Sequence, residues 1–433
     1  MGIPDIRIIL PPKEELSAWW DKLDQAGRQF VESHISRLLP LLRVNIHGGL
    51  IQALAHCWCP ETSTFIFGGK HELTPTLEEY SIAIGKPLKA ELISPPIGID
   101  PVVALSDFLR IKEDNVRKVL KAHRNTCHLS FLKECFENGN SFQMRRVFLL
   151  AFFGFILFPH CKNAINPLMA HLVEQVLGGK NFVNTIMAET FLSLTRFKGS
   201  GDKTFHSSPE LLQIWFLSHI KGFGGLMTIH DVNNSNHPIM RFENNQKHAP
   251  DYHYSRWLAF MKKPTSKGFL WHAKWFQVRV ARLSCGGVGP IPLLGFTGAT
   301  EYYPTRVIRQ YQVVQELPPA LQANPLRVSF IDGNRGHEDS ILTIKSMWDM
   351  CQPRKLKWPE EELKDKEMKY YASIKYIQQH KIPEELLPKI PKVPLKITNR
   401  AENKRLKRVA EKAQEENKRL RRVVSRVYID QAR

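Results

Sequence analysis

Residues 147–158 are the feature that most restricts how this chain can fold. They read Val-Phe-Leu-Leu-Ala-Phe-Phe-Gly-Phe-Ile-Leu-Phe, and every residue except Gly154 is apolar. A membrane-spanning helix needs about 20 apolar residues, so this shorter run predicts a helix in a protein core. Because such a helix is apolar on every side, other elements must cover it on every side. The sequence therefore predicts a globular region built around this segment.

The segment 49–88 predicts a helix, a strand and a second helix. Its first apolar residues recur at helical spacing, and Pro60 is expected to end that helix, because proline restricts the residue before it. Residues 64–67 are β-branched or aromatic, which is typical of a strand. Thr76 and Glu79 have the spacing of a capping box, in which each side chain binds the backbone N–H of the other residue.

This segment carries a family resemblance together with one earlier piece, Trp19 and Trp20, and three later pieces in the same order, at 146–159, 211–215 and 303–311. The motif positions are Trp58, Pro60, Glu61, Thr62, Phe65, Leu77, Glu79, Tyr80, Pro304, Arg309 and Gln310. On these residues the chain resembles the plant mobile domain, and more closely a related domain of unknown function in plant transposon-associated proteins. The resemblance covers residues 15–335. It implies a transposon-derived origin in a plant, and it transfers no catalytic role to any residue.

The remaining patterns of the globular region predict mostly helices. Helices are expected at 112–123, 164–177, 182–194, 209–219 and 306–315, a strand at 276–280, and a loop at 222–250. The predicted fold class is mainly α, or α+β with a small antiparallel sheet. A compact helical domain is expected to precede a basic C-terminal helix.

The charge of the chain indicates polyanionic partners. It has 61 Lys and Arg against 42 Asp and Glu, a formal net charge of +19. A balance this basic favours nucleic acid first, and acidic proteins or anionic lipid next. No segment predicts a membrane span, so a membrane is not an expected partner. Seven cysteines, an odd number without regular spacing, predict a reducing compartment.

No metal or cofactor site is predicted. Cys57 and Cys59 are separated by one residue, whereas zinc sites usually use Cys-x-x-Cys, and no second pair follows. A metal bound by these thiols and His56 stays open as the less favoured alternative to structural thiols. Residues 285–290 lack the lysine of a phosphate-binding loop and predict a tight turn.

No catalytic residue is predicted either. His219, Asp251 and His253 have acid–base chemistry, but they are expected to be solvated. Glu78 and Glu79 stand at the start of a helix, where carboxylates offset the helix dipole.

Arg306, Arg309 and Gln310 share one face of the predicted helix 306–315 and leave two interpretations open. The face binds phosphates or an acidic partner, or it ties the helix to backbone carbonyls as a structural clamp.

The chain changes character after residue 340. We predict three parts: a globular domain at 1–340, a helix with a proline-rich linker at 341–394, and a basic helix at 395–433. The linker contains four prolines between residues 383 and 394, which predict a stiff, extended segment.

The final part contains a repeat with an offset of two heptads. Residues 402–409 read Glu-Asn-Lys-Arg-Leu-Lys-Arg-Val, and 416–423 read Glu-Asn-Lys-Arg-Leu-Arg-Arg-Val. With Asn403 and Asn417 at position a, and Leu406 at position d, the pattern predicts a short coiled coil and a parallel homodimer. A register with Leu406 at position a stays open as the alternative to this seam.

The same helix is strongly basic. Residues 391–433 contain fourteen Lys and Arg and five Asp and Glu, so they carry nearly half of the total charge. Two clusters resemble nuclear-import signals and predict contact with DNA or RNA. Their basic residues are Lys404, Arg405, Lys407, Arg408, Lys418, Arg419, Arg421 and Arg422. The alternative is an ordinary solvated helix face.

Three functions are consistent with these patterns. The favoured one is a non-enzymatic, transposon-derived nuclear interaction protein whose tail dimerises or contacts nucleic acid without sequence specificity. The second is a plant scaffold with no nucleic-acid role. The third is an enzyme with an unrecognised site, which requires a deep cleft lined by converging carboxylates or histidines. The expected location is the nucleus, with the cytoplasm as the alternative.

Overall fold

The structure is a computed structural model of the chain, and it describes residues 5–356 with several gaps. The gaps are residues 69–70, 89–90, 200–201, 229–235, 263–267, 287–288, 314, 316–325 and 331–336. Contacts divide the chain into two units, Met1–Lys381 and Ile382–Arg433, and all described residues belong to the first unit. The predicted linker, the coiled coil and the eight basic residues of the tail lie outside the described residues.

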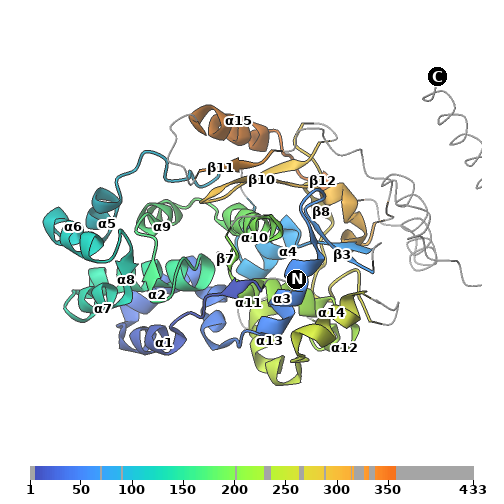
Figure 1. Cartoon of the computed structure of the whole chain (residues 1–433), viewed down its shortest axis with the longest axis horizontal. Helices are drawn as coiled ribbons and strands as arrows, with labels where there is room; N and C mark the ends of the chain where they lie inside the picture. The colour runs from blue at the N-terminus through green and yellow to red at the C-terminus, as the bar shows by residue number, and fades with distance from the viewer. Residues whose placement is uncertain are drawn as a thin grey trace, which may run out of the picture. The chain divides into compact units, whose positions relative to one another are not determined.

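Helices dominate the first unit, with small sheets between them, so the predicted mainly α or α+β class is confirmed (Figure 1). The N-terminal helices are α1 (Lys13–Lys22), α2 (Gln25–Ile35), η1 (Ser36–Arg43), α3 (Gly48–Cys57), α4 (Leu77–Ile84), α5 (Pro101–Leu109), α6 (Glu113–Ala122), α7 (Leu129–Glu137) and α8 (Ser141–Phe152). The later helices are η2 (Phe153–Leu157), α9 (Met169–Leu177), α10 (Val183–Lys198), α11 (Pro209–Ser218), α12 (Lys221–Gly224), α13 (Pro238–Asn245), η3 (Gln246–His248), α14 (Tyr254–Lys262), η4 (Pro304–Arg306), η5 (Ile308–Tyr311) and α15 (Glu338–Asp349).

The apolar segment 147–158 lies in the core, as predicted. Its apolar side chains from Val147 to Leu157 are at most 1% exposed. The last turns form a π helix, η2, which the sequence pattern does not indicate. Gly154 packs tightly against the side chain of Ile165, because a Cβ at position 154 would lie 2.4 Å from Ile165 Cγ2. The π helix η2 follows α8 directly and ends before Phe158.

The strands form two three-stranded antiparallel sheets and three two-stranded pairs among the described residues. The first sheet is β2 (Trp58–Cys59), β3 (Thr64–Phe67) and β4 (His71–Leu73), and the second is β9 (Ile291–Leu294), β10 (Gly298–Tyr302) and β11 (Val328–Ser329). The pairs are β1 (Arg7–Ile8) with β7 (Thr204–Phe205), which is parallel, β5 (Cys127–His128) with β6 (Ala164–Ile165), and β8 (Val280–Ala281) with β12 (Arg354–Lys355).

The sheet β9–β10–β11 lies between two helices. Figure 1 shows α15 on one side of it and α10 on the other, and both helices contact β9. Every residue of β9 and β10 is buried, as expected for strands covered on both faces. Ala299 of β10 pairs with Leu294 of β9.

The helix–strand–helix prediction for 49–88 is confirmed in its main features. Strand β3 occupies residues 64–67, and the capping box is present: Glu79 N donates to Thr76 Oγ1 (3.1 Å), and Thr76 N donates to Glu79 Oε2 (2.9 Å). The first helix ends at Cys57, before Pro60, because the residues between them pair with β3 as strand β2.

Several other predictions are wrong. The alternation at 276–280 does not form a strand, and only β8 at its end pairs with another segment. The helix at 306–315 is replaced by the two short 3₁₀ helices η4 and η5, and Gln312 is left-handed, with φ 61°. The segment 222–250 contains helix α13 in addition to loops. The helix predicted at 164–177 begins only after strand β6.

The globular domain continues past residue 340. Helix α15 begins at Glu338, and its Trp348 is 1% exposed and donates to the Pro292 carbonyl (2.6 Å). Strand β12 then pairs with β8. The change of composition near residue 340 therefore falls inside the folded domain.

Within the part of the chain that the structure describes, no single helix is long and apolar enough to cross a membrane. One strongly bent pair, Gln25–Arg43 with Gly48–Cys57, meets the length and composition criteria only when its two helices are taken together.

Candidate functional site

The aromatic residues that carry the family resemblance lie in the core and serve packing. Trp58 and Phe65 lie on the neighbouring strands β2 and β3, with ring centroids 5.1 Å apart. The Trp58 Nε1–H donates to Thr195 Oγ1 on α10 (3.1 Å). Phe65, Leu77 and Tyr80 are at most 1% exposed. These positions hold the first sheet against α10.

The turn before β3 contains three further motif residues. Thr62 is buried, and its hydroxyl lies 2.7 Å from the hydroxyl of Thr64. Pro60 is half-buried, and the exposed Glu61 accepts a hydrogen bond from the Cys59 thiol (3.2 Å). These contacts stabilise the turn.

Glu79 is the centre of a buried hydrogen-bond network. Its carboxylate is inaccessible to solvent and accepts from Trp215 Nε1 (3.0 Å), His219 Nε2 (3.0 Å) and Gln310 Nε2 (3.1 Å). A fourth donor is the Thr76 backbone N–H of the capping box. The network therefore joins α4, the C-terminal end of α11 and η5, three segments that are far apart in the sequence. A buried carboxylate is tolerated where several donors satisfy its oxygens.

A second buried connection joins β4 to the short helices η4 and η5. The Arg306 guanidinium binds both carboxylate oxygens of Glu72, at 2.9 Å for the closest pair, and both side chains are 2% exposed. Arg309 donates to the Glu72 carbonyl (2.6 Å), and Gln310 donates to the Thr74 carbonyl (2.9 Å). The clamp interpretation of Arg309 and Gln310 is thus confirmed. Pro304, the remaining motif residue, is buried at the start of η4.

Glu78 is the third buried carboxylate of this region. It accepts from the Arg282 N–H (2.8 Å) and the Tyr311 hydroxyl (2.5 Å). Burial raises the pKa of Glu78, although these hydrogen bonds act in the opposite direction. The explanation of Glu78 and Glu79 by the helix dipole alone is wrong, because both carboxylates bind distant segments. The expectation that His219 is solvated is also wrong, since it is buried beside Glu79.

A cavity of about 780 Å³ lies beside α10, in the size range of small-molecule sites. The π turn η2 leads directly to its rim at Phe158, Pro159 and His160. Its apolar wall includes Phe158, Met169, Phe296 and Phe330, and its polar lining includes Arg7, His160, Asn166, Glu189, Arg196, Asp202, Thr297 and His206. The lining thus contains two carboxylates and two histidines, the residue types named for the enzyme alternative.

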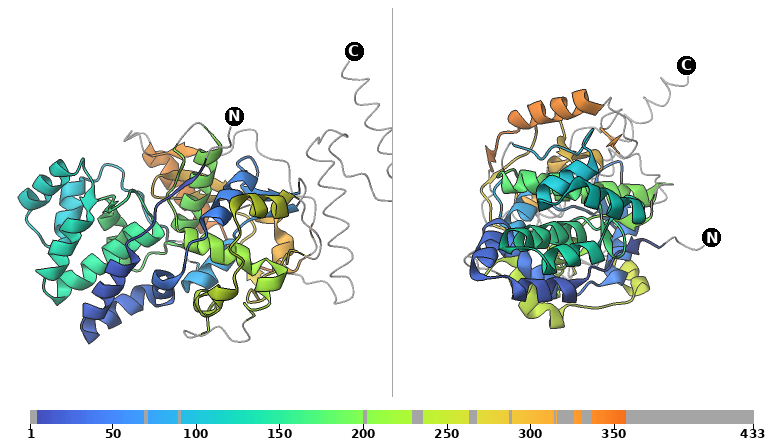
Figure 2. Two further views of the ribbon diagram at one scale, coloured as in Figure 1. Left: turned by 60° about the horizontal axis from the view of Figure 1, so that its bottom comes forward. Right: turned by 90° about the vertical axis from the view of Figure 1, so that its left-hand side faces the viewer.

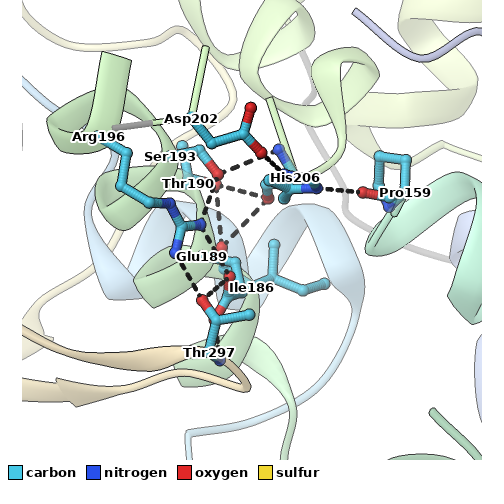
Figure 3. Close-up of polar contacts among 10 residues, drawn as sticks. Pro159, Ile186, Glu189, Thr190, Ser193, Arg196, Asp202, His206 and Thr297 are labelled. Carbon is cyan, nitrogen blue, oxygen red and sulfur yellow. Dashed lines mark hydrogen bonds and ion pairs between the residues drawn. The ribbon is translucent and has the colours of Figure 1, made fainter. Parts of the chain in front are cut away.

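Asp202 and His206 form the principal charged pair of the cavity (Figure 3). His206 Nε2 lies 2.6 Å from Asp202 Oδ2, and His206 Nδ1 lies 2.9 Å from the Pro159 carbonyl oxygen. Both ring nitrogens therefore face acceptors, which only an imidazolium satisfies with two donors. Burial acts to raise the pKa of Asp202, but hydrogen bonds from His206 and Thr204 outweigh it and lower this pKa to about 2.

Glu189, Arg196 and Thr297 form a second polar group in the cavity lining (Figure 3). Glu189 is buried and accepts from the Thr297 backbone N–H (2.7 Å) and hydroxyl (2.8 Å). The Arg196 guanidinium lies 3.6 Å from Glu189 and donates to the Thr297 hydroxyl (2.9 Å). These contacts tie the turn between β9 and β10 to α10 and fix one side of the cavity.

His160 is the histidine of the cavity that stays available to a ligand. No hydrogen bond joins its ring to another residue within the described ranges, and its ring centroid lies 6.0 Å from that of His206. Burial lowers the pKa of His160, and the positive charge of His206 lowers it further. A neutral imidazole at pH 7 can accept a proton or a hydrogen bond from a bound molecule.

The metal alternative at Cys57 and Cys59 gains no support. Across the described ranges, no three His, Cys, Asp or Glu side chains are placed to hold a metal ion. Burial raises the pKa of Cys57 to about 12, which disfavours the thiolate that binds metals.

The cavity residues were not identified from the sequence. Asp202 and His206 are four residues apart, a spacing that would indicate an ion pair on a helix. In the structure they flank the short strand β7 instead. Their proximity to Pro159 and His160 depends on the tertiary fold. The predicted tail residues cannot be placed against this site, because they lie outside the described residues.

The fold and these contacts define a mainly α domain whose motif residues form an internal clamp. Residues 16–378 match the model of a family described as a domain of unknown function, DUF7745, and the chain belongs to this family. No curated protein and no solved structure matches the chain. The relation to the plant mobile domain stays a prediction.

Proposed function

We propose that the chain is a non-enzymatic nuclear interaction protein of plant transposon origin, related to the plant mobile domain. In this proposal its basic tail contacts nucleic acid without sequence specificity. The observation that carries the proposal is the surplus of nine positive charges in residues 391–433. Phosphate backbones attract such a segment, and their counterion release makes the contact dependent on salt.

Helix formation in the tail would be coupled to this contact. Lys404 and Arg408, and likewise Lys418 and Arg422, are four residues apart. Like charges at this spacing destabilise an isolated helix by about 0.2–0.5 kcal/mol per pair. A polyanion removes that repulsion, so it binds the helical form preferentially.

Dimerisation would strengthen the same contact. The seam with Asn403 and Asn417 at position a favours two parallel strands in register. Two tails in one dimer present twice the charge to one polyanion, and linked contacts bind more tightly than separate ones.

The clamp in the first unit supports a non-enzymatic role. Glu72, Glu79, Arg306, Arg309 and Gln310 are all buried and bound within the domain. Their polar groups are engaged in holding the fold, so these five residues offer no reactive group to a substrate.

Salt-dependent binding to a random-sequence duplex DNA pool tests the tail. We compare the wild-type chain with a variant in which Lys404, Arg405, Lys407 and Arg408 are replaced by Gln. Loss of up to four phosphate contacts would lower the slope of log K against log salt by about 3.6. A charge-preserving variant with Arg405→Lys and Arg408→Lys is the control and should keep the slope. An unchanged slope in the Gln variant would refute the contact.

Import of the tagged chain into nuclei tests the predicted location. A variant in which Lys418, Arg419, Arg421 and Arg422 are also replaced by Gln has lost both clusters and should accumulate in the cytoplasm, whereas the charge-preserving variant should stay nuclear. Sedimentation of the full chain over a range of concentrations tests the homodimer, because Asn417→Lys would place like charges in the seam and should shift the equilibrium to monomers.

The cavity favours a second candidate function, binding of a small organic anion. Arg7 lines the cavity and forms no ion pair with another described residue, while His160 offers a free imidazole. Phe296 and Phe330 supply an apolar surface for the body of such a molecule. NMR of the histidine rings during titration with benzoate provides the test. The His160 signal should shift while that of the exposed His253 stays constant, and equal shifts would refute a specific site.

A further inference from the structure

Helices α5 and α6 form a helix–turn–helix at the edge of the first unit (Figures 1 and 2). Only residues 110–112 separate them. Arg110 is left-handed, with φ 55° and ψ 50°, which ends α5 abruptly. The Ile111 N–H donates to the Ser106 carbonyl (3.1 Å), and the Ser106 hydroxyl donates to the Ile111 carbonyl. The turn is therefore fixed by two hydrogen bonds.

The two helices pack against each other through a small apolar interface. Leu105 and Leu109 of α5 and Val116 and Leu120 of α6 are at most 2% exposed. Ser106, which makes both hydrogen bonds of the turn, is buried. In DNA-binding helix–turn–helix units, a short turn and such an interface hold the second helix in a fixed direction.

Helix α8 fixes this pair to the core. The Arg146 guanidinium donates to the Phe108 carbonyl at the C-terminal end of α5 (3.1 Å) and lies 4.7 Å from the centroid of the Phe108 ring. Gln143 donates to the Leu109 carbonyl (3.1 Å). The last carbonyls of α5 are thus bound, and α6 stands on a rigid support.

The outer face of α6 is basic. Arg117, Lys118 and Lys121 are exposed, and Arg110 and Arg124 extend the charge at the two ends of the helix. Among the described residues, only Arg117 of these five forms an ion pair, at 3.5 Å from Glu113. Surface pairs of this kind are weak, so the charge of the face remains available to a partner.

We propose that α6 lies in the major groove of duplex DNA, as the recognition helix of this helix–turn–helix. A helix with side chains is about 10–12 Å wide, which matches the groove of about 12 Å. Lys118, Lys121 and Arg124 would contact phosphates, and Arg117 would reach base edges. This inference goes beyond the proposed function, because it places a duplex contact in the first unit, independent of the tail.

The acidic residues at the start of α6 fit this geometry. Glu113 and Asp114 are exposed on the first turn, the part of a recognition helix that contacts base edges. A carboxylate there repels phosphates but accepts from the amino group of cytosine. The combination of acidic first turn and basic later turns favours a sequence-selective contact over a purely electrostatic one.

Fluorescence anisotropy of the full chain on a random-sequence duplex DNA pool tests the basic face. The variant Lys118→Ala/Lys121→Ala should weaken binding about ten-fold at low salt and lower the slope of log K against log salt by about 2. Alanine favours the helix, so α6 should stay folded. The matched control Lys221→Ala/Lys247→Ala removes two exposed charges from α12 and η3 and should leave the slope unchanged.

Selection of bound sequences from the same pool tests groove insertion. The wild-type chain should enrich a short sequence motif. Glu113→Gln should bind the unselected pool more tightly than wild type, but it should enrich this motif less strongly. When both tail clusters are replaced by Gln, an A-form RNA duplex should compete poorly, because its major groove is too narrow for a helix.

The outcomes separate this inference from the proposed function. Suppose that the slope of log K against log salt is unchanged in the α6 variant but lowered in the tail variant with four Gln substitutions. The inference then fails and the proposed function stands. If only the α6 variant loses binding, the tail proposal fails alone. Equal competition by RNA duplex, or no enriched motif, overturns groove insertion. A circular dichroism spectrum identical to wild type is required of each variant, and Lys118→Gln/Lys121→Gln replaces the alanine variant if it misfolds.

Discussion

Replacement of Glu79 is expected to have very different effects according to the shape of the new side chain. The carboxylate accepts four hydrogen bonds from Thr76, Trp215, His219 and Gln310. Glu79→Ala removes the acceptor and leaves these donors buried. Each unsatisfied buried donor costs about 1–3 kcal/mol, so three or more of them cost roughly 3–9 kcal/mol. Because domains are stable by only about 5–15 kcal/mol, this variant should be largely unfolded.

Glu79→Gln should be much milder, because His219 can adapt. His219 Nδ1 lies 2.8 Å from the Leu270 carbonyl, so that nitrogen stays a donor. When the ring is neutral, Nε2 becomes an acceptor and can receive a hydrogen bond from the amide NH₂. The amide oxygen then accepts from the other donors. Every donor and acceptor of the network then keeps a partner, so this variant should cost only about 1–2 kcal/mol.

Urea unfolding followed by far-ultraviolet circular dichroism measures this difference. The control is Glu14→Gln, which changes an exposed carboxylate on α1 in the same way and should change the free energy of unfolding by less than about 0.5 kcal/mol. If Glu79→Ala and Glu79→Gln cost the same within about 1 kcal/mol, the carboxylate does not organise this network.

Three further perturbations test the core and the cavity. The pKa of Asp202 is about 2 in the folded state, below its usual 3.8. The pair of Asp202 and His206 therefore stabilises the fold above about pH 4, and this stabilisation is lost as the pH falls towards 2. Asp202→Asn should remove this contribution to the pH dependence of the free energy of unfolding. Gly154→Ala places a methyl group 2.4 Å from an isoleucine side chain and should destabilise by about 1–3 kcal/mol in urea unfolding, whereas Gly222→Ala, with free space around it, should not. In NMR titrations, the pKa of His160 should lie below the usual histidine value of 6.5. His206→Gln removes a positive charge and should raise the pKa of His160, although burial should still keep that pKa below 6.5.

The parts of the fold that follow from the sequence are those with local causes. The capping box at Thr76 and Glu79 needs only four consecutive residues, and the cap of α11 by Ser208 needs the same. The apolar run at 147–158 has to be buried whatever surrounds it. In each case the signal and the structure lie within the same short segment.

The parts that do not follow have distant causes. Arg309 and Gln310 have helical spacing, but the carbonyls of Glu72 and Thr74 bind them and bend the segment into two 3₁₀ turns. The alternation at 276–280 suits a strand, yet only its last residue finds a partner, in β12. No pattern within either segment indicates the distant residues involved.

The candidate sites divide in the same way. Most residues of the resemblance motif lie in the interior, where Glu79 and Gln310 bind each other, and the ion pair of Glu72 and Arg306 is buried as well. These four residues stabilise the fold of the domain. They cannot contact a partner directly, since all four are buried.

Function therefore has to be sought in residues outside the clamp. Among the described residues, helix α6 and the cavity around His160 contribute no donor or acceptor to the clamp, so changes there should leave it intact. For this reason, substitutions at Lys118, at His160 or in residues 404–408 are informative about function, whereas loss of activity after a change at Glu79 or Arg306 would report only the loss of the fold.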